Sequence, residues 1–255
     1  MAIQRIKVLD VPVDICEAQD IEEKILEMEA QPGTKQIVFL SVWDLLRARR
    51  KGDYARCVQN ADLILPISKS ILKGAKKLKQ PIPVRYNPFN AIISILSVLE
   101  SHYKSLYMLG GRKKTLMAAE KNVRATFKDL QIVGRYVGFY PKQVENDIVQ
   151  AIYKASPSLV LVSEGIKEKD GWAYNRRNSF SSSIFLYQKD IIGIFGERIT
   201  RISEKKFDKG LEILDEIKHN PLKIFLIFPY MKYRILLIWY RLFKKDSKQN
   251  AKSEN

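Results

Sequence analysis

Glycines placed directly after apolar strands are the first residues that could do chemistry. Gly110 and Gly111 end the apolar segment 105–111 and precede a helical segment. Glycines at such a turn let a backbone approach a phosphate, while the amides of the next helix point toward it. Gly138 and Gly165 follow apolar segments in the same way. None of them belongs to a GxGxxG or Walker motif, so a tight turn between strand and helix explains them equally well.

Carboxylates near strand ends are the next candidates, for acid–base chemistry. Asp44 and Asp62 lie near the ends of apolar strands, although a helix cap or a surface charge explains each more economically. The sequence has no GxSxG, no cysteine beside a histidine and no DxD pair, so it offers neither a nucleophile motif nor ligands for a divalent metal. His102 and His219 lie far apart, which disfavours a four-ligand zinc site. We therefore expect no metal and no cofactor.

The charge balance is the unusual feature of the composition. The 255 residues are 46% hydrophobic and 28% charged, but 44 Lys and Arg against 28 Asp and Glu give a net charge of +16. This excess predicts an anionic partner, which could be nucleic acid, a phosphorylated ligand or an acidic membrane surface. Cys16 and Cys57 are the two cysteines, and two thiols without a disulfide framework indicate the cytoplasm. No apolar run is long enough to predict a transmembrane helix.

Apolar strands alternate with helical segments along most of the chain. Besides a strand region at 5–15, the strand-like segments are 36–42, 61–66, 105–111, 130–140 and 158–165. Continuous apolar strands in this order indicate a parallel sheet with helices on both faces. We expect an α/β, Rossmann-like fold with a helical C-terminal appendage. Ligands of such folds bind at the carboxyl ends of the strands.

The segment 221–245 mixes apolar and aromatic residues with cations. The last 35 residues carry eight Lys and Arg against two Asp and Glu. A segment that lies in a membrane interface needs this mixture. The predicted membrane contacts are Lys232, Arg234, Trp239, Arg241, Lys244 and Lys245. A pair of core-packing helices is the alternative, and nucleic-acid binding is disfavoured because a base-stacking groove would be more polar.

These observations divide the chain into three expected regions. Residues 1–195 form the Rossmann-like core, residues 196–245 form the helical, membrane-facing appendage, and residues 246–255 form a disordered tail.

Several segments, in their order along the chain, resemble motifs of the WecG/TagA/CpsF family of bacterial glycosyltransferases. VLDVPVDI resembles the opening strand of the family, and the segment ending in ADLILP resembles "ADlvlpDG". SLYMLGG, IVGRYVGFY and SPSLVLVSEG resemble "vfllGg", "ivgthhGyf" and "pdillVglG". Arg85 stands at the family arginine, and Arg201 followed by Gly210-Leu211-Glu212 resembles "RAPkw…GLEW". The resemblance covers nearly the whole chain, and its specificity lies in the order and spacing of the motifs.

The resemblance implies an inverting glycosyltransferase that works without a bound metal. Such an enzyme moves an N-acetylhexosamine of the ManNAc type from a UDP-sugar to a polyprenyl-diphosphate-linked sugar, in the synthesis of cell-envelope polysaccharides. It also implies a peripheral position on the inner face of the cytoplasmic membrane. The implied substrate-binding residues are Ser41, Ser68, Arg85, Gly110, Gly111, Gly138, Gly165 and Arg201.

Several polar positions of the family motifs are replaced in this sequence. Ile67 stands where the family has the aspartate proposed as the base, and an isoleucine cannot accept a proton. Asp62, Asn90 and Asp170 are the remaining candidates for catalysis. One interpretation is an active transferase with a relocated site. The other is a non-catalytic relative that binds a sugar nucleotide, a lipid-linked sugar or a partner glycosyltransferase, and a homo-oligomer also stays open.

Overall fold

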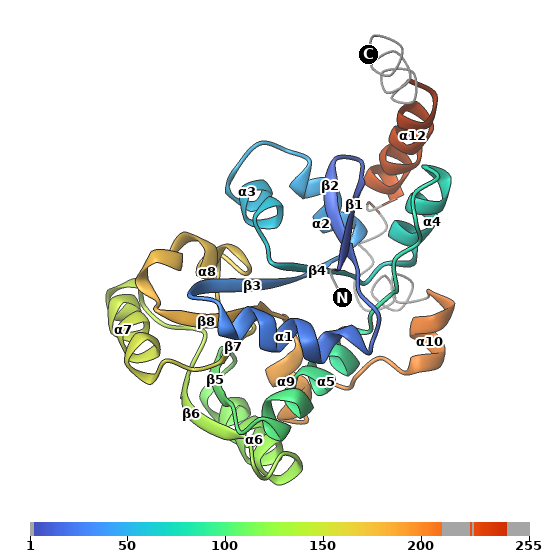
Figure 1. The fold of residues 1–255 in the computed structure, drawn as a ribbon. Helices are drawn as coiled ribbons and strands as arrows, with labels where there is room; N and C mark the ends of the chain where they lie inside the picture. Colours follow the sequence, from blue (N-terminus) through green and yellow to red (C-terminus); the bar gives the residue numbers. More distant parts are fainter. Residues whose placement is uncertain (1–2, 211–224, 226, 244–255) are drawn as a thin grey trace.

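A six-stranded parallel sheet forms the centre of the molecule (Figure 1). The structure is a computed structural model that describes residues 3–210, 225 and 227–243. The strand order is β4-β3-β8-β7-β5-β6, and every neighbouring pair is parallel. The α/β, Rossmann-like expectation is therefore confirmed. The strands are β3 (Gly33–Leu40), β4 (Leu63–Pro66), β5 (Ser105–Leu109), β6 (Gln131–Tyr136), β7 (Leu159–Val162) and β8 (Ser182–Tyr187).

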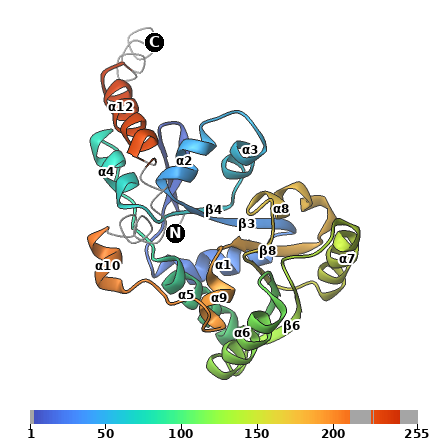
Figure 2. The same ribbon diagram turned by 180° about the vertical axis from the view of Figure 1, so that it is seen from behind.

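Helices cover both faces of the sheet, as Figures 1 and 2 show from opposite sides. One face packs against α1 (Asp20–Ala30), α5 (Pro88–Ser101), α6 (Lys113–Thr126) and α9 (Ile191–Phe195). The other face packs against α2 (Val42–Ala48), α3 (Asp53–Gln59), α4 (Lys69–Lys77), α7 (Glu145–Ala155) and α8 (Gly171–Asn175). Single-turn 3-10 helices occupy Lys142–Val144 and Arg177–Ser179. Because both faces are covered, strands such as β4 and β7 are buried along their whole length and need continuous apolar sequence.

The strand region expected at 5–15 forms a hairpin outside the main sheet. Strands β1 (Gln4–Val8) and β2 (Val11–Ile15) pair antiparallel in a sheet of their own. The two-residue turn between them has positive φ at both Leu9 and Asp10, the backbone that tight hairpins require. A two-residue turn reverses the chain, so the region cannot continue as one strand of the parallel sheet.

Asp14 fastens the hairpin to the main sheet. Its Oδ1 accepts from Arg5 Nε at 2.6 Å, and its Oδ2 accepts from Arg5 Nη2 at 2.8 Å and from the Ile64 amide at 2.7 Å. The Asp14 side chain is 2% exposed. This one carboxylate therefore satisfies a buried amide of β4 as well as the hairpin's own arginine.

The C-terminal part of the described chain contains α10 (Glu204–Lys209) and α12 (Ile227–Phe243). Helix α12 packs against α2 and α4. The Tyr233 hydroxyl donates to the Ser70 carbonyl at 2.8 Å, and Gly74 lies so close beneath it that any side chain there would overlap the hydroxyl. No helix in the described residues combines the length and apolar character needed to cross a membrane.

We expect Asp14→Ala to lower the free energy of unfolding by about 2–4 kcal/mol, because it leaves the buried Ile64 amide without its acceptor and removes the ion-pair partner of Arg5. The control is Asp53→Ala, since the Asp53–Arg56 pair is 67% exposed on both sides and contributes at most about 1 kcal/mol. Urea unfolding followed by circular dichroism measures both. Equal losses in the two variants would show that Asp14 does not fasten the hairpin.

Candidate functional site

The loops after β3 and β4 meet at the carboxyl edge of the sheet. Ser41 directly follows β3 and begins α2, and Ser68 precedes α4. The Ser68 hydroxyl accepts from the Val42 amide at 3.1 Å, and the Ile67 amide donates to the Leu40 carbonyl at 3.0 Å. The structure thus brings Ser41 and Ser68 together, as expected for residues that follow neighbouring parallel strands.

Arg85 lies at the same edge and joins it to α10. Its Nε donates to the Ile67 carbonyl at 2.8 Å, and its Nη1 donates to the Phe207 carbonyl at 2.6 Å. The guanidinium carbon also lies 3.7 Å from the centre of the Phe207 ring. Lys69 Nζ donates to the Asp208 carbonyl at 3.2 Å. Two cations are therefore held at the end of β4 by the backbone of α10.

Asn90 lies in the first turn of α5, and Arg201, which precedes α10, lies over Phe89 of the same turn. Asn90 Nδ2 donates to Glu204 Oε1 at 3.0 Å, and the Arg201 guanidinium carbon is 5.3 Å from the centre of the Phe89 ring. Both side chains are exposed. Of the residues expected in the site, Ser41, Ser68, Arg85, Asn90 and Arg201 therefore share one region.

The glycine turns at the other strand ends pack against one another. The Gly110 amide donates to Tyr136, the Gly111 amide to Glu164 and the Gly138 amide to Gly111, all through backbone carbonyls at 2.8–2.9 Å. A side chain at Gly138 would overlap the Glu164 carbonyl, and a Cβ at Gly165 would lie 2.6 Å from the Gly138 carbonyl carbon. These glycines let three turns of the protein approach one another closely. That they also bind a phosphate stays a prediction.

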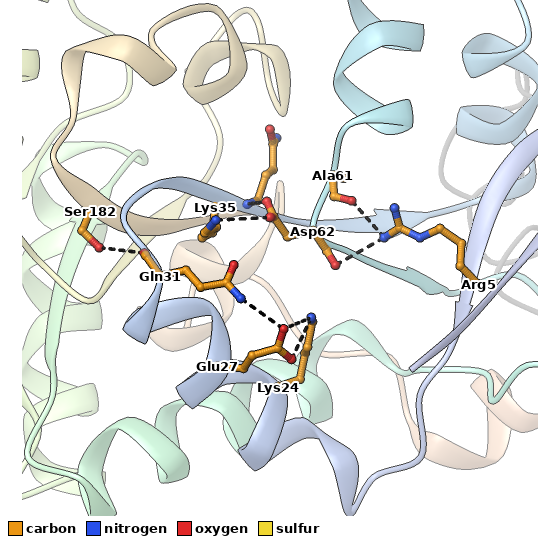
Figure 3. A network of polar contacts seen from close by, with 9 residues as sticks. Arg5, Lys24, Glu27, Gln31, Lys35, Ala61, Asp62 and Ser182 are labelled. Atoms are coloured by element: carbon orange, nitrogen blue, oxygen red, sulfur yellow. Dashed lines mark hydrogen bonds and ion pairs between the residues drawn. The ribbon is translucent and has the colours of Figure 1, made fainter. Parts of the chain in front are cut away.

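Asp62 lies at the opposite, amino edge of the sheet (Figure 3). Its Oδ2 accepts from the Gln36 amide at 2.8 Å, and its Oδ1 is 3.9 Å from Lys35 Nζ. A cavity of about 530 Å³ opens here, lined by Ile3, Arg5, Asp14, Glu23, Lys24, Glu27 and Asp62. Parallel sheets bind ligands at their carboxyl ends, so we do not assign this cavity or Asp62 to the site.

Asp170 directly precedes α8 and lies against α3, where Cys57 Sγ donates to its backbone carbonyl. Its backbone carbonyl accepts from Gln36 Nε2 at 2.7 Å, and its side chain is among the few buried acids. Burial, together with the charge of the Asp44 carboxylate, raises the pKa of Asp170 to about 7. Asp170 is thus a carboxyl that holds a proton close to neutral pH.

Two buried tyrosines that the sequence did not single out interact electrostatically with Asp170. Burial raises the pKa of Tyr54, with Asp44 and Asp170 adding to the effect, and burial and Asp170 raise the pKa of Tyr187. Arg47 lies over the Tyr54 ring at 4.1 Å. Tyr187 ends β8, a strand the sequence interpretation did not assign, so its position at a strand end gave no signal.

The described residues contain no group of three His, Cys, Asp or Glu arranged to hold a metal.

The raised pKa of Asp170 predicts a pH-dependent stability. The folded protein keeps a proton on Asp170 from its ordinary pKa of 3.8 up to about 7, whereas the unfolded chain loses it, so stability falls as pH rises through this range. Between pH 4 and pH 8, we expect the free energy of unfolding of the wild type to fall by up to roughly 4 kcal/mol more than that of Asp170→Asn. Urea unfolding at both pH values, with Asp53→Asn as control, tests this; parallel curves for wild type and Asp170→Asn would contradict it.

Comparison with known proteins identifies the family. The model of the glycosyl transferase WecG/TagA/CpsF family matches residues 6–251. An N-acetylglucosaminyldiphosphoundecaprenol N-acetyl-β-D-mannosaminyltransferase of Bacillus spizizenii is 20% identical over 168 residues, which cover 66% of this chain and 65% of the relative. A protein of the same name from Staphylococcus aureus (strain NCTC 8325 / PS 47) is 19% identical over 133 residues, 52% of each chain. The chain thus matches between half and two thirds of the length of these relatives. The family resemblance drawn from the motifs is confirmed: this chain belongs to the WecG/TagA/CpsF family of glycosyltransferases.

Proposed function

We propose that the chain transfers an N-acetylhexosamine of the ManNAc type from a UDP-sugar to a polyprenyl-diphosphate-linked GlcNAc. The observation that carries the proposal is the family match over residues 6–251, which spans the sheet, α10 and α12. The names of the two relatives describe the transfer of an N-acetylmannosaminyl group to a lipid-diphosphate-linked N-acetylglucosamine. We propose that this chain catalyses the same class of transfer.

The cations at the end of β4 support a site for a diphosphate. Arg85 and Lys69 already donate to the backbone carbonyls at the end of α10, and Arg201 is exposed beside them. Guanidinium groups bind phosphate oxygens through paired hydrogen bonds. We assign the donor diphosphate to this region, with Ser41, Ser68 and Asn90 as neutral polar groups around it.

Helix α12 supports contact with a membrane surface. One side of it is buried through Tyr233 and Leu237. The opposite side exposes large apolar residues spaced three or four apart, namely Phe228, Met231, Ile235, Ile238, Trp239 and Leu242. Lys232, Arg234 and Arg241 are exposed along the same helix. An exposed apolar stripe accompanied by cations suits an anionic lipid surface, and we propose that the chain lies peripherally on the inner face of the cytoplasmic membrane. Lys244, Lys245 and residues 246–255 lie outside the described residues.

A transfer assay tests the enzymatic function. Purified chain, given UDP-ManNAc and a polyprenyl-diphosphate-GlcNAc analogue, should form the lipid-linked disaccharide. Arg85→Ala should lower kcat/KM by at least about tenfold, because it removes a charge-assisted hydrogen bond to the diphosphate. The control is Arg124→Ala, since Arg124 pairs with Glu120 on α6. Binding of the donor without any product would instead favour the non-catalytic alternative.

A vesicle assay tests the role of α12. The double variant Ile235→Glu/Trp239→Glu should sediment far less with anionic vesicles than the wild type, because both side chains lie on the exposed apolar stripe. Tyr153→Glu on α7 is the matched control, since Tyr153 is similarly exposed, at 49%, on another part of the protein. Neutral vesicles should bind the wild type more weakly, because each cation near an anionic surface contributes about 1 kcal/mol. Equal sedimentation of both variants would contradict the membrane contact.

A further inference from the structure

Helices α4 and α12 lie side by side at one end of the molecule (Figures 1 and 2). The Tyr233 hydroxyl of α12 donates to the Ser70 carbonyl of α4 at 2.8 Å. A Cβ at Gly74 would overlap that hydroxyl and would lie 3.4 Å from Leu237 Cδ2. Because Gly74 has no side chain, the two helices approach closely, and a surface that α12 contacts also lies next to α4.

Two lysines of α4 flank this contact. Lys73 directly precedes Gly74, and Lys77 follows Gly74 by three residues. Residues four apart share one side of a helix, so the two lysine side chains leave α4 one turn apart. Lys73 is exposed and Lys77 is half-buried.

A cation of α12 comes to the same place. Arg234 is exposed, and it interacts with Tyr230, one turn before it. Burial acts to raise the pKa of Tyr230, but hydrogen bonding to Ser70 and Arg234 and the charges of Arg234 and Lys73 lower that pKa overall. Lys73 of α4 and Arg234 of α12 thus act on one tyrosine. We call Lys73, Lys77 and Arg234 the basic seam.

The basic seam carries positive charge that the described residues leave without a paired carboxylate. The sequence has no Asp or Glu from residue 63 to residue 99, and none in α12. Within the described part of the chain, none of the three cations forms an ion pair. On α6, by contrast, Arg124 pairs with Glu120. An anionic partner therefore complements the charge of the seam.

The exposed apolar stripe of α12 indicates which anionic partner fits. Beside the seam, α12 exposes Ile235, Trp239 and Leu242, each by more than half. A nucleic acid binds cations through its phosphates and would leave these side chains in water. A bilayer interface offers acyl chains to the stripe and anionic headgroups to the seam.

We propose that α4 is a second membrane-contacting element, in which Lys73 and Lys77, together with Arg234, bind anionic lipid headgroups beside the apolar stripe of α12. The inference rests on the proposed function, because it builds on the membrane contact proposed there for α12. It assigns the cations of a helix within the α/β core to the same lipid surface.

The contact through α4 also orients the candidate site. Helix α4 begins directly after Ser68, and Lys69 in its first turn donates to the Asp208 carbonyl of α10. Headgroups bound along α4 therefore lie next to the region assigned to the diphosphate. A diphosphate-linked acceptor carried in the bilayer reaches the site from this side.

Vesicle binding tests the seam. Lys73→Gln/Lys77→Gln should bind vesicles of phosphatidylglycerol and phosphatidylcholine about 25-fold more weakly than the wild type, because each cation near an anionic surface strengthens binding about fivefold. The matched control, Lys121→Gln/Lys154→Gln, removes the same charge from exposed lysines of α6 and α7. Equal weakening in both variants would show an effect of net charge alone and would overturn the role of α4.

A fluorescent label tests whether α4 itself meets the lipid. Cys16 and Cys57 are buried, so a thiol-reactive, environment-sensitive dye on the folded protein should attach to an introduced surface cysteine. The emission of labelled Lys73→Cys should shift to the blue when anionic vesicles are added, whereas that of labelled Lys121→Cys on α6 should not. An unshifted emission from Lys73→Cys on vesicle-bound protein would overturn the contact.

The outcomes separate this inference from the proposed function. Neither readout depends on sugar transfer, so an inactive wild type that still gives both results would remove the enzymatic proposal alone. A wild type that does not bind vesicles would overturn the membrane contact of α12 and of α4 together. Binding to duplex DNA instead, weakened by Lys73→Gln/Lys77→Gln, would overturn the lipid partner in favour of a nucleic acid.

Discussion

The burial of both faces of the parallel sheet is the constraint on which the rest of the structure depends. A parallel strand can follow another only after a crossover, and each crossover here places helices on a face of the sheet. All carboxyl ends therefore reach the same edge, whatever the loops contain. Polar residues that follow the strands, such as Ser41 and Ser68, therefore lie at the same edge although they are far apart in sequence.

At that edge, several polar groups already form hydrogen bonds with the protein's own backbone. Arg85 and Lys69 donate to carbonyls of α10, and the amides of Gly110, Gly111 and Gly138 donate to carbonyls of neighbouring turns. Such contacts hold loops and helix α10 in fixed positions. They also mean that a diphosphate bound by Arg85 would share or replace existing hydrogen bonds, so donor binding and the position of α10 are linked through this arginine.

Asp170 and Tyr54 carry the costs of burial that Asp14 avoids. Burial disfavours the charged form of the Asp170 carboxyl, and the buried Tyr54 hydroxyl has no hydrogen-bond partner among the described residues. Asp14 is also buried, but it accepts three hydrogen bonds and fastens the hairpin.

The sequence by itself determined the fold class, the family and the apolar character of the C-terminal segment, because each depends on local patterns. Continuous apolar strands and the order of short motifs can be seen along the chain. Only the tertiary structure decided that Asp62 lies at the amino edge, that β8 lies between β3 and β7, and that Gln36 and Cys57 both donate to the Asp170 carbonyl. These are contacts between residues up to more than a hundred positions apart. They depend on strand order and on which face each crossover covers, and no local pattern of residues encodes either.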